Sequence, residues 1–244
     1  MPDSNLSLTY DELRQRIGKE RGHGTDIERW SDSEKENIEF IIKDALRTFY
    51  SGSGYEWSFL KPLAELTIAN GTTSLVLPAD FGFLIGNIYF DEPAFSTPLM
   101  VVGDVQDILR MRQQSETSGR PSIAAFSVMG APGQTHNQRQ TLEFWPEASD
   151  SYDLVCRYSV LPDALSSTSQ YCYGGQMHAE TIKEACLAAS EKFDGVQGLH
   201  SQLYMQCLNA SITNDRKLKP QSLGMNGRLA LGYGNQTVTY VPNL

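Results

Sequence analysis

The spacing of apolar residues changes twice along this 244-residue chain, and the two changes limit the folds open to it. Between residues 31 and 50, apolar side chains recur every three or four positions, which is typical of one face of an α-helix. Between residues 66 and 160 they alternate with polar ones, as in half-buried β-strands. The helical spacing returns between residues 182 and 210. This order predicts an α+β protein: a helical bundle from the N- and C-terminal parts, a central antiparallel β-rich domain and an extended C-terminal tail.

Polar segments indicate where the first two helices begin. Thr9–Glu12 has the spacing of a capping box, in which each of the two side chains can bond the other residue's backbone N–H, and Ser31–Glu34 opens the second helix. These patterns predict a short helix over about residues 10–17 and a long helix over residues 31–50. Glycine has no Cβ and suits the left-handed position that ends a helix. The predicted stops are Gly18 for the first helix, and Gly52 and Gly54 for the second.

The middle of the chain is typical of strands separated by turns. Leu66 and Ile68 alternate with polar neighbours, Asn70-Gly71 is a favoured hairpin turn, and Leu75 and Leu77 alternate after it. The pattern therefore predicts a β-hairpin around this turn. Asp104 is expected to cap a short helix. Further strands are predicted over residues 84–90, 99–102, 123–129, 141–145 and 152–160.

Two more helical stripes follow a Ser-rich loop near residue 166, with a short Gly-containing break at residues 194–198 between them. Helices joined by so short a loop form an antiparallel hairpin, and this hairpin most simply packs on the helix over residues 31–50. The first stripe consists of Ile182, Ala185, Cys186, Ala189 and Phe193, and the second of Leu199, Leu203, Cys207 and Ala210.

These patterns divide the chain into N-terminal helices (1–57), a β-rich insertion (58–165), a C-terminal helical hairpin (166–218) and a tail (219–244). The tail is polar and rich in glycine, and only residues 237–241 have the composition of a strand. It cannot bury enough apolar area to order itself, so we expect a partner to hold it. The residues expected at that interface are Tyr233, Val238, Tyr240 and Val241.

The charge balance argues against a protein that grips nucleic acid over its whole surface. Asp and Glu number 29 against 20 Lys and Arg, which gives a net charge of −9. One basic cluster stands out, at Arg110, Arg112 and Arg120. It could face a partner or DNA phosphates, although a solvated surface is the commoner use of such a cluster.

Motifs of enzyme and metal sites are absent from the sequence. The chain has no phosphate-binding loop, no HExxH and no GxSxG, and its four cysteines never form a CxxC pair. His178, Glu180 and Glu184 are the nearest approach to an acid–base cluster, but carboxylates in the first turn of a helix are expected from its dipole. We therefore expect no catalytic residue, no metal and no cofactor.

No apolar run approaches the roughly 20 residues that a membrane span needs, and the first residues lack the pattern of a signal peptide. The sequence therefore predicts no membrane association and folding in a reducing cytoplasm.

The alternating aromatics Tyr55, Trp57 and Phe59 could stack on bases, but packing in a core or an interface is their commoner use.

Several of these segments, taken in order, resemble bacteriophage head–tail adaptor proteins, above all the tail tubular and gatekeeper-type adaptors of short-tailed phages. In that family a helix leads into an aromatic segment and then into a strand that ends in Leu-Pro. The segments that carry the resemblance are the helix over 31–50, Gly54–Phe59, Leu77–Phe81, Ser118–Pro121, Leu142–Pro146, Tyr158–Pro162 and Thr181–Glu191.

The resemblance implies a structural connector in the virion, at the head–tail junction, assembled in the host cytoplasm. Such adaptors form a ring, usually of twelve subunits, beneath the portal protein, and a tail nozzle or stopper protein attaches below. A C-terminal segment commonly reaches the portal or a neighbouring subunit. Genomic DNA passes through without specific binding, and an acidic channel wall would repel its phosphates.

Two other functions stay open from the residues alone. A module that binds a DNA end or a tail component would use Arg110, Arg112 and Arg120, and it requires them on one exposed face without acidic neighbours. An enzyme of an unrecognised class would use His178, Glu180 and Glu184, and it requires them to converge in a pocket.

Overall fold

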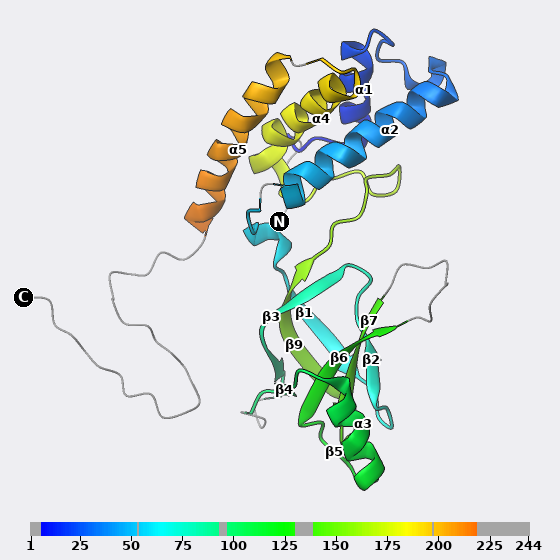
Figure 1. Ribbon diagram of the computed structural model, residues 1–244, viewed down its shortest axis with the longest axis vertical. Helices are drawn as coiled ribbons and strands as arrows, with labels where there is room; N and C mark the ends of the chain where they lie inside the picture. The colour runs from blue at the N-terminus through cyan, green and yellow to red at the C-terminus, as the bar shows by residue number, and fades with distance from the viewer. Residues whose placement is uncertain (1–5, 53, 93–96, 130–138, 197, 219–244) are drawn as a thin grey trace, which may run out of the picture.

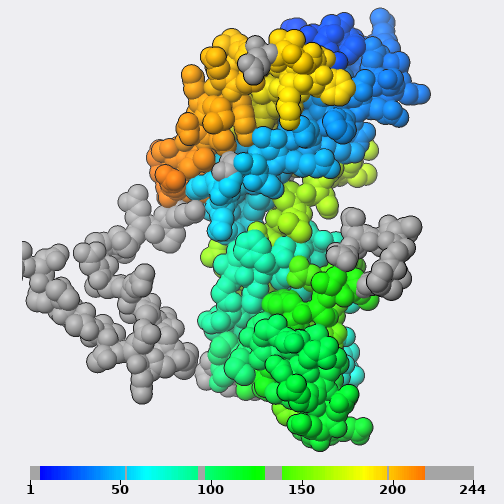
Figure 2. Space-filling view, in the orientation of Figure 1, coloured from blue at the N-terminus to red at the C-terminus, as the bar shows by residue number. Residues whose placement is uncertain are grey.

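The computed structural model describes residues 6–52, 54–92, 97–129, 139–196 and 198–218, and every structural statement below concerns these residues. Four helices gather at one end of the molecule, and the strands gather at the other together with one further helix (Figure 1). The chain crosses between the two ends twice, after α2 and again after β9. Figure 2 shows these crossings as a short neck between the helical part and the β part. The predicted mixed α+β class is confirmed.

The helical part is built around α4 (Ala179–Phe193). This helix packs against α1 (Tyr10–Glu20), α2 (Asp32–Arg47) and α5 (Leu199–Leu218). Helices α2 and α5 lie on different sides of α4, and they contact each other slightly at most. The hairpin of α4 and α5 therefore packs on α2 through α4 alone, which leaves room between α2 and α5.

The capping box predicted at Thr9–Glu12 is confirmed, and the structure has a second one at Ser31–Glu34. The Glu12 backbone N–H donates to Thr9 Oγ1 at 3.2 Å, and the Thr9 N–H donates to Glu12 Oε2 at 2.8 Å. At the start of α2, the corresponding distances between Glu34 and Ser31 are 3.3 and 2.7 Å. Each box satisfies backbone N–H groups that have no partner within the helix.

The predicted end of the first helix is wrong, because α1 continues through Gly18 to Glu20. Gly18 lies under the indole of Trp30, and a Cβ at this position would stand 2.2 Å from Trp30 Cζ2. This glycine therefore allows close packing and does not end the helix. The second helix ends near its predicted stop: α2 passes into a π-helical turn, Thr48–Gly52, and Gly54 has a positive φ of 63°.

The β part contains two main sheets. The first has the order β1-β9-β3 and is antiparallel; the second has the order β2-β7-β6-β4 and ends in a parallel pair. A short parallel pair, β5 with β8, stands apart, so the predicted antiparallel arrangement holds for most of the pairs and not for β4–β6 or β5–β8. The bounds are β1 Leu63–Ile68, β2 Ser74–Val76, β3 Phe81–Phe90, β4 Met100–Val101, β5 Ser118–Gly119, β6 Ile123–Met129, β7 Arg139–Trp145, β8 Glu147–Ala148 and β9 Tyr152–Val160, with α3 (Val105–Gln114) between β4 and β5.

The predicted hairpin around Asn70-Gly71 is wrong. The turn forms, with Gly71 at φ 72°, but β1 pairs with β9 whereas β2 pairs with β7. Backbone bonds from the β7–β8 region capture the chain directly after the turn: the Ala148 N–H donates to the Thr72 carbonyl at 3.0 Å. Pairing with distant segments therefore overrides the local turn signal.

The inward face of β9 agrees with the alternation in the sequence. Its odd-numbered residues are exposed or half-buried, whereas its even-numbered residues are buried and pack into the core. The core is continuous from the helical part into the β part. The buried residues of β9 are Tyr152, Leu154, Cys156, Tyr158 and Val160.

The predicted apolar face of α5 is displaced by about one residue. Leu199 is 63% exposed, while Tyr204, Leu208, Ser211 and Asp215 are buried. Two of these four are polar, and both have partners on other elements: the Ser211 hydroxyl bonds that of Thr181 at 2.6 Å. The buried face of α5 contains polar residues that bond other elements, so it does not form a continuous apolar stripe in the sequence. The apolar stripe predicted from the sequence therefore lies beside the buried face and not on it.

Candidate functional site

The first notable site is the junction at which the end of α5 meets the connector that leads into the β part. The connector begins after α2 and contains the short 3₁₀ turn Ser58–Leu60. Asp215, fully buried on α5, accepts hydrogen bonds from the Ser58 backbone N–H at 3.2 Å and from the Tyr55 hydroxyl at 2.8 Å. The Ser58 hydroxyl donates to the same carboxylate at 2.5 Å. A buried carboxylate with three donors fixes this end of α5 on the connector.

The aromatic residues of the connector lie in the core beside this junction. Trp57 is 1% exposed, and its Nε1–H donates to the Phe49 carbonyl at 3.1 Å. The rings of Trp57 and Phe59 lie within 5.1 Å of the His178 ring, centroid to centroid. Stacking on nucleic-acid bases would require exposed rings. Trp57 therefore serves packing, as the commoner interpretation holds.

His178 is buried in this aromatic cluster. It is 1% exposed, and its Nδ1 has no hydrogen-bond partner among the described residues. Burial holds the pKa of His178 below its ordinary value, and the nearby Asp215 carboxylate opposes that shift. The histidine is therefore neutral near pH 7.

Glu184 has different neighbours from His178. Its carboxylate bonds His200 Nδ1 at 2.7 Å and Lys183 Nζ at 3.1 Å, which ties α4 to the start of α5. Burial raises the pKa of Glu184, but the hydrogen bonds from His200 and Lys183 outweigh burial, and the pKa lies below its ordinary value. Glu180 is exposed on its side chain and pairs with Lys183.

The acid–base candidates therefore take part in two separate sets of contacts, one in the aromatic core and one at the start of α5. Within the described ranges, no group of three or more His, Cys, Asp or Glu side chains is arranged to hold a metal ion. Sequence reasoning overlooked Asp215 and His200, which bond the connector and Glu184 respectively. The only signal in the sequence was the position of each residue relative to the expected stripe of α5. His200 directly follows Leu199, the first residue of that stripe, and Asp215 lies beyond its last residue, Ala210.

The three arginines of the basic cluster do not share one environment. Arg112 pairs with Glu143 at 2.9 Å and donates to the Phe144 carbonyl at 3.0 Å, so it links α3 to β7. Arg110 is 67% exposed on its side chain and lies 3.4 Å from Asp107. Arg120 lies over the Phe90 ring, at 5.2 Å. A DNA-binding face would need these arginines exposed and without acidic neighbours. Because Arg110 and Arg112 each lie beside a carboxylate, the cluster does not meet that condition.

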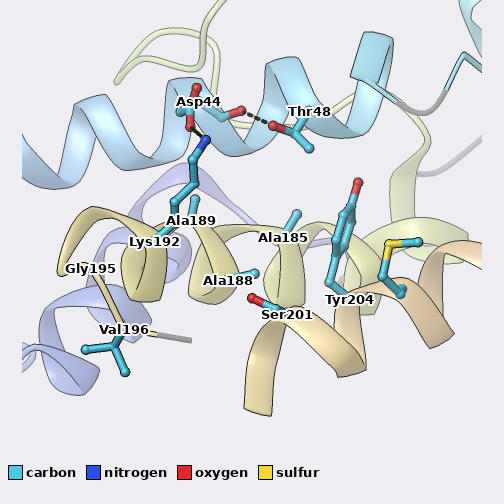
Figure 3. A pocket seen from close by; sticks show the side chains of 11 residues that line it. Asp44, Thr48, Ala185, Ala188, Ala189, Lys192, Gly195, Val196, Ser201 and Tyr204 are labelled. Atoms are coloured by element: carbon cyan, nitrogen blue, oxygen red, sulfur yellow. Dashed lines mark hydrogen bonds and ion pairs between the residues drawn. The ribbon is translucent and has the colours of Figure 1, made fainter. Parts of the chain in front are cut away.

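An apolar groove runs along the helical part between α2 and α5. Its floor is the small-residue face of α4, and its volume is about 530 Å³ (Figure 3). At one rim the Lys192 ammonium lies 3.6 Å from Asp44. Large apolar side chains continue the surface beyond the groove. The lining and flanking residues are Ala185, Ala188, Ala189, Val196, Ser201, Tyr204, Met205, Phe40 and Phe193.

The predicted interface residues of the tail lie outside the described residues. This applies to Tyr233, Val238, Tyr240 and Val241, together with the whole of segment 219–244. Their role as an interface stays a prediction. In the part of the chain that is described, no helix has the length and apolar character needed to cross a membrane.

Comparison with known proteins identifies one family. The family model described as SU10 adaptor protein matches residues 8–225. The match covers α1 to α5 and all the strands described above, so it includes the helical part, the β part and the junction between Asp215 and Ser58. No curated protein matches the chain.

Proposed function

Because this chain belongs to the SU10 adaptor protein family, and is therefore a structural phage adaptor protein, we propose that it joins the head of a virion to its tail. Several copies would form a closed head-to-tail ring beneath the portal protein, with twelve as the expected number. A tail nozzle or stopper protein would attach on the other side of the ring. Assembly would take place in the host cytoplasm.

The family match over most of the chain is the observation that carries this proposal. The two-part architecture also supports it, because an adaptor must present one surface to the head and another to the tail. Two chain crossings and the Asp215–Ser58 contact hold these parts together at the neck. The four segments 1–57, 58–165, 166–218 and 219–244 would then serve as the units of assembly.

The acidic balance of the chain supports passage of DNA without retention. A net charge of −9 on each subunit, repeated around a ring, would give the channel a negative potential. Phosphates would be repelled, so no counterion release would drive binding. Genomic DNA is therefore proposed as a passing partner and not as a specific ligand.

The tail is proposed as the segment that attaches each subunit to the portal or to an adjacent copy. Segment 219–244 follows α5, whose last residues are fixed at the neck by Asp215. Residues 237–241 have the β-branched and aromatic composition of a strand that adds to a sheet edge. Tyr233, Val238, Tyr240 and Val241 would supply its side-chain contacts.

Mass and particle symmetry, measured with and without the cognate portal, test the proposal. We expect a discrete subunit alone and a closed ring on the portal, with interfaces that each bury more than roughly 1,000 Å² in total. A chain that neither binds the portal nor forms a ring would overturn the adaptor function proposed here. A portal lacking its tail-facing surface is the matched negative control.

A further inference from the structure

The groove between α2 and α5 is a gap in the helical part that a short peptide segment would fill. Its walls are two helices, and its floor carries Ala185, Ala188 and Ala189, whose small side chains let another backbone come close. Met205 in the groove is 54% exposed, and Phe40 beside the groove is 57% exposed. A surface of this apolar character, extended along a bundle, is more typical of a docking site than of a surface left in water.

One buried polar group points to a ligand with hydrogen-bonding atoms. Tyr204 is 8% exposed and lines the groove, and its hydroxyl has no partner among the described residues. Figure 3 shows its ring reaching from α5 toward the C-terminal end of α2. Leaving a buried hydroxyl unpaired is unfavourable, because the group has given up its hydrogen bonds to water without replacing them. A peptide carbonyl or N–H brought into the groove would remove that cost, because a backbone offers both a donor and an acceptor at each residue.

The length of the chain beyond α5 allows this segment to come from the protein itself. Tyr204 and Leu218 are fourteen residues apart on α5, so the groove lies about 21 Å back from the end of the helix at ~1.5 Å per residue. The eleven residues from Leu218 to Leu229 span up to about 36 Å when extended. Residues 228–231 can therefore reach the groove with slack to spare.

The charge and composition of that stretch match the groove. Residues 228–231 read Arg-Leu-Ala-Leu, and segment 219–244 contains two basic residues and no acidic ones. The groove rim carries Asp44, whose present partner Lys192 lies at 3.6 Å and is 78% exposed on its side chain. An arginine would bind this carboxylate with two parallel hydrogen bonds, which a lysine cannot form.

We propose that in the free subunit residues 228–231 dock in the groove of their own chain, with Leu229 and Leu231 against the α4 floor and Arg228 on Asp44. Under the proposed function, the tail would have to leave the groove before it reaches the portal or a neighbouring copy. The groove would thus hold the attachment segment until a competing surface takes it.

Disulfide trapping in the dilute full-length subunit, without portal, tests the docking directly. The variant pairs Ala188→Cys with Leu229→Cys, in a background in which Cys172 and Cys207 are serine. The matched control pairs Leu229→Cys with Gln106→Cys, an exposed position on α3 in the β part. We expect the groove pair to form an intramolecular disulfide at least tenfold faster than the control pair. Equal rates, or disulfides formed only between subunits, would overturn the proposal.

Methionine oxidation gives a second measurement that needs no engineered cysteine. Met205 in the groove and Met100 in β4 are 54% and 55% exposed, so they are matched in the described structure. Truncation after Lys219 should raise the rate of Met205 oxidation by peroxide at least threefold and leave that of Met100 unchanged. An unchanged Met205 rate would count against docking. Since both measurements use the free subunit, their failure leaves portal attachment to be judged separately.

Discussion

The carboxylate of Asp215 lies 3.2 Å from the backbone nitrogen of Ser58, a residue 157 positions earlier in the sequence. This contact ties the last turn of α5 to the connector through which the chain enters the β part. The tail begins four residues after Asp215. Asp215 is therefore a direct, buried link between the helix that precedes the tail and the connector.

Replacement of Asp215 by alanine should lower the free energy of unfolding by about 3 kcal/mol or more, because hydrogen bonds to a charged group contribute roughly 1.5–3 kcal/mol and both donors of Ser58 would lose their acceptor. Chemical denaturation measures this change. Asn209→Ala, at an exposed position of the same helix, should stay within about 0.5 kcal/mol of the wild type. A loss for Asp215→Ala no larger than that of the control would contradict the assigned role.

Local signals in the sequence predict the helix starts of this fold well. Thr9 and Ser31 act through residues three positions away, so the pattern and the interaction are read together. The turn at Asn70-Gly71 is also predicted, but its strands are not, because β1 and β2 choose partners more than 60 residues away. Such pairings are decided by the whole sheet and not by the turn.

The junction could not be predicted for a related reason. Asp215 appears in the sequence as one acidic residue near a helix end, where solvent exposure is the default expectation. Its burial depends on donors from the connector, Tyr55 and Ser58, which only the tertiary fold brings to α5. The sequence shows that these residues can form hydrogen bonds, but it does not show that the fold brings them into contact.

His178 should make the protein acid-sensitive. Its pKa is lowered in the folded state, so the unfolded chain takes up the proton first as the pH falls. The stability that this group contributes is complete above its ordinary value of 6.5 and is lost as the pH falls through the lower folded value. His178→Phe keeps an aromatic ring among Trp57 and Phe59 and removes the titration. The slope of unfolding free energy between pH 7 and 5 should therefore be smaller in the variant; an unchanged slope would assign the sensitivity elsewhere.

Glu184 is expected to support stability and not chemistry. Its lowered pKa means that its contribution is complete above its ordinary value of 4.5 and is lost as the pH falls below it. Glu184→Gln removes the charge beside Lys183 and His200 and should lower the melting temperature. Particles that do assemble from Glu184→Gln or His178→Ala protein should remain infectious. Full assembly combined with loss of infectivity would favour an enzyme over a structural connector.

The arginines separate a structural role from a DNA-binding role. Arg112→Ala should destabilise the β part by about 2 kcal/mol, because it leaves Glu143 and the Phe144 carbonyl without their partner. Arg110→Ala, on an exposed side chain, should be nearly neutral for stability. If these residues held DNA, Arg110→Ala would also weaken binding to duplex DNA and reduce its dependence on salt. We expect no such change for either variant in a fluorescence anisotropy titration.

Truncation after Lys219 should separate folding from attachment. The described core ends with α5, and Asp215 keeps its partners in the shortened chain, so the melting temperature should fall by no more than about 2 °C. Ordering a free tail costs roughly 1–2 kcal/mol per residue in backbone entropy, which only contacts with a surface outside the tail can offset. The truncated protein should therefore fold but bind filled heads poorly, giving particles that leak DNA or lack tails. Tyr233→Ala with Tyr240→Ala in the full-length chain should reproduce part of this defect, whereas replacing the exposed Gln106 by alanine should not. Truncated protein that assembles normally, on heads that retain their DNA, would show that the tail plays no part in attachment.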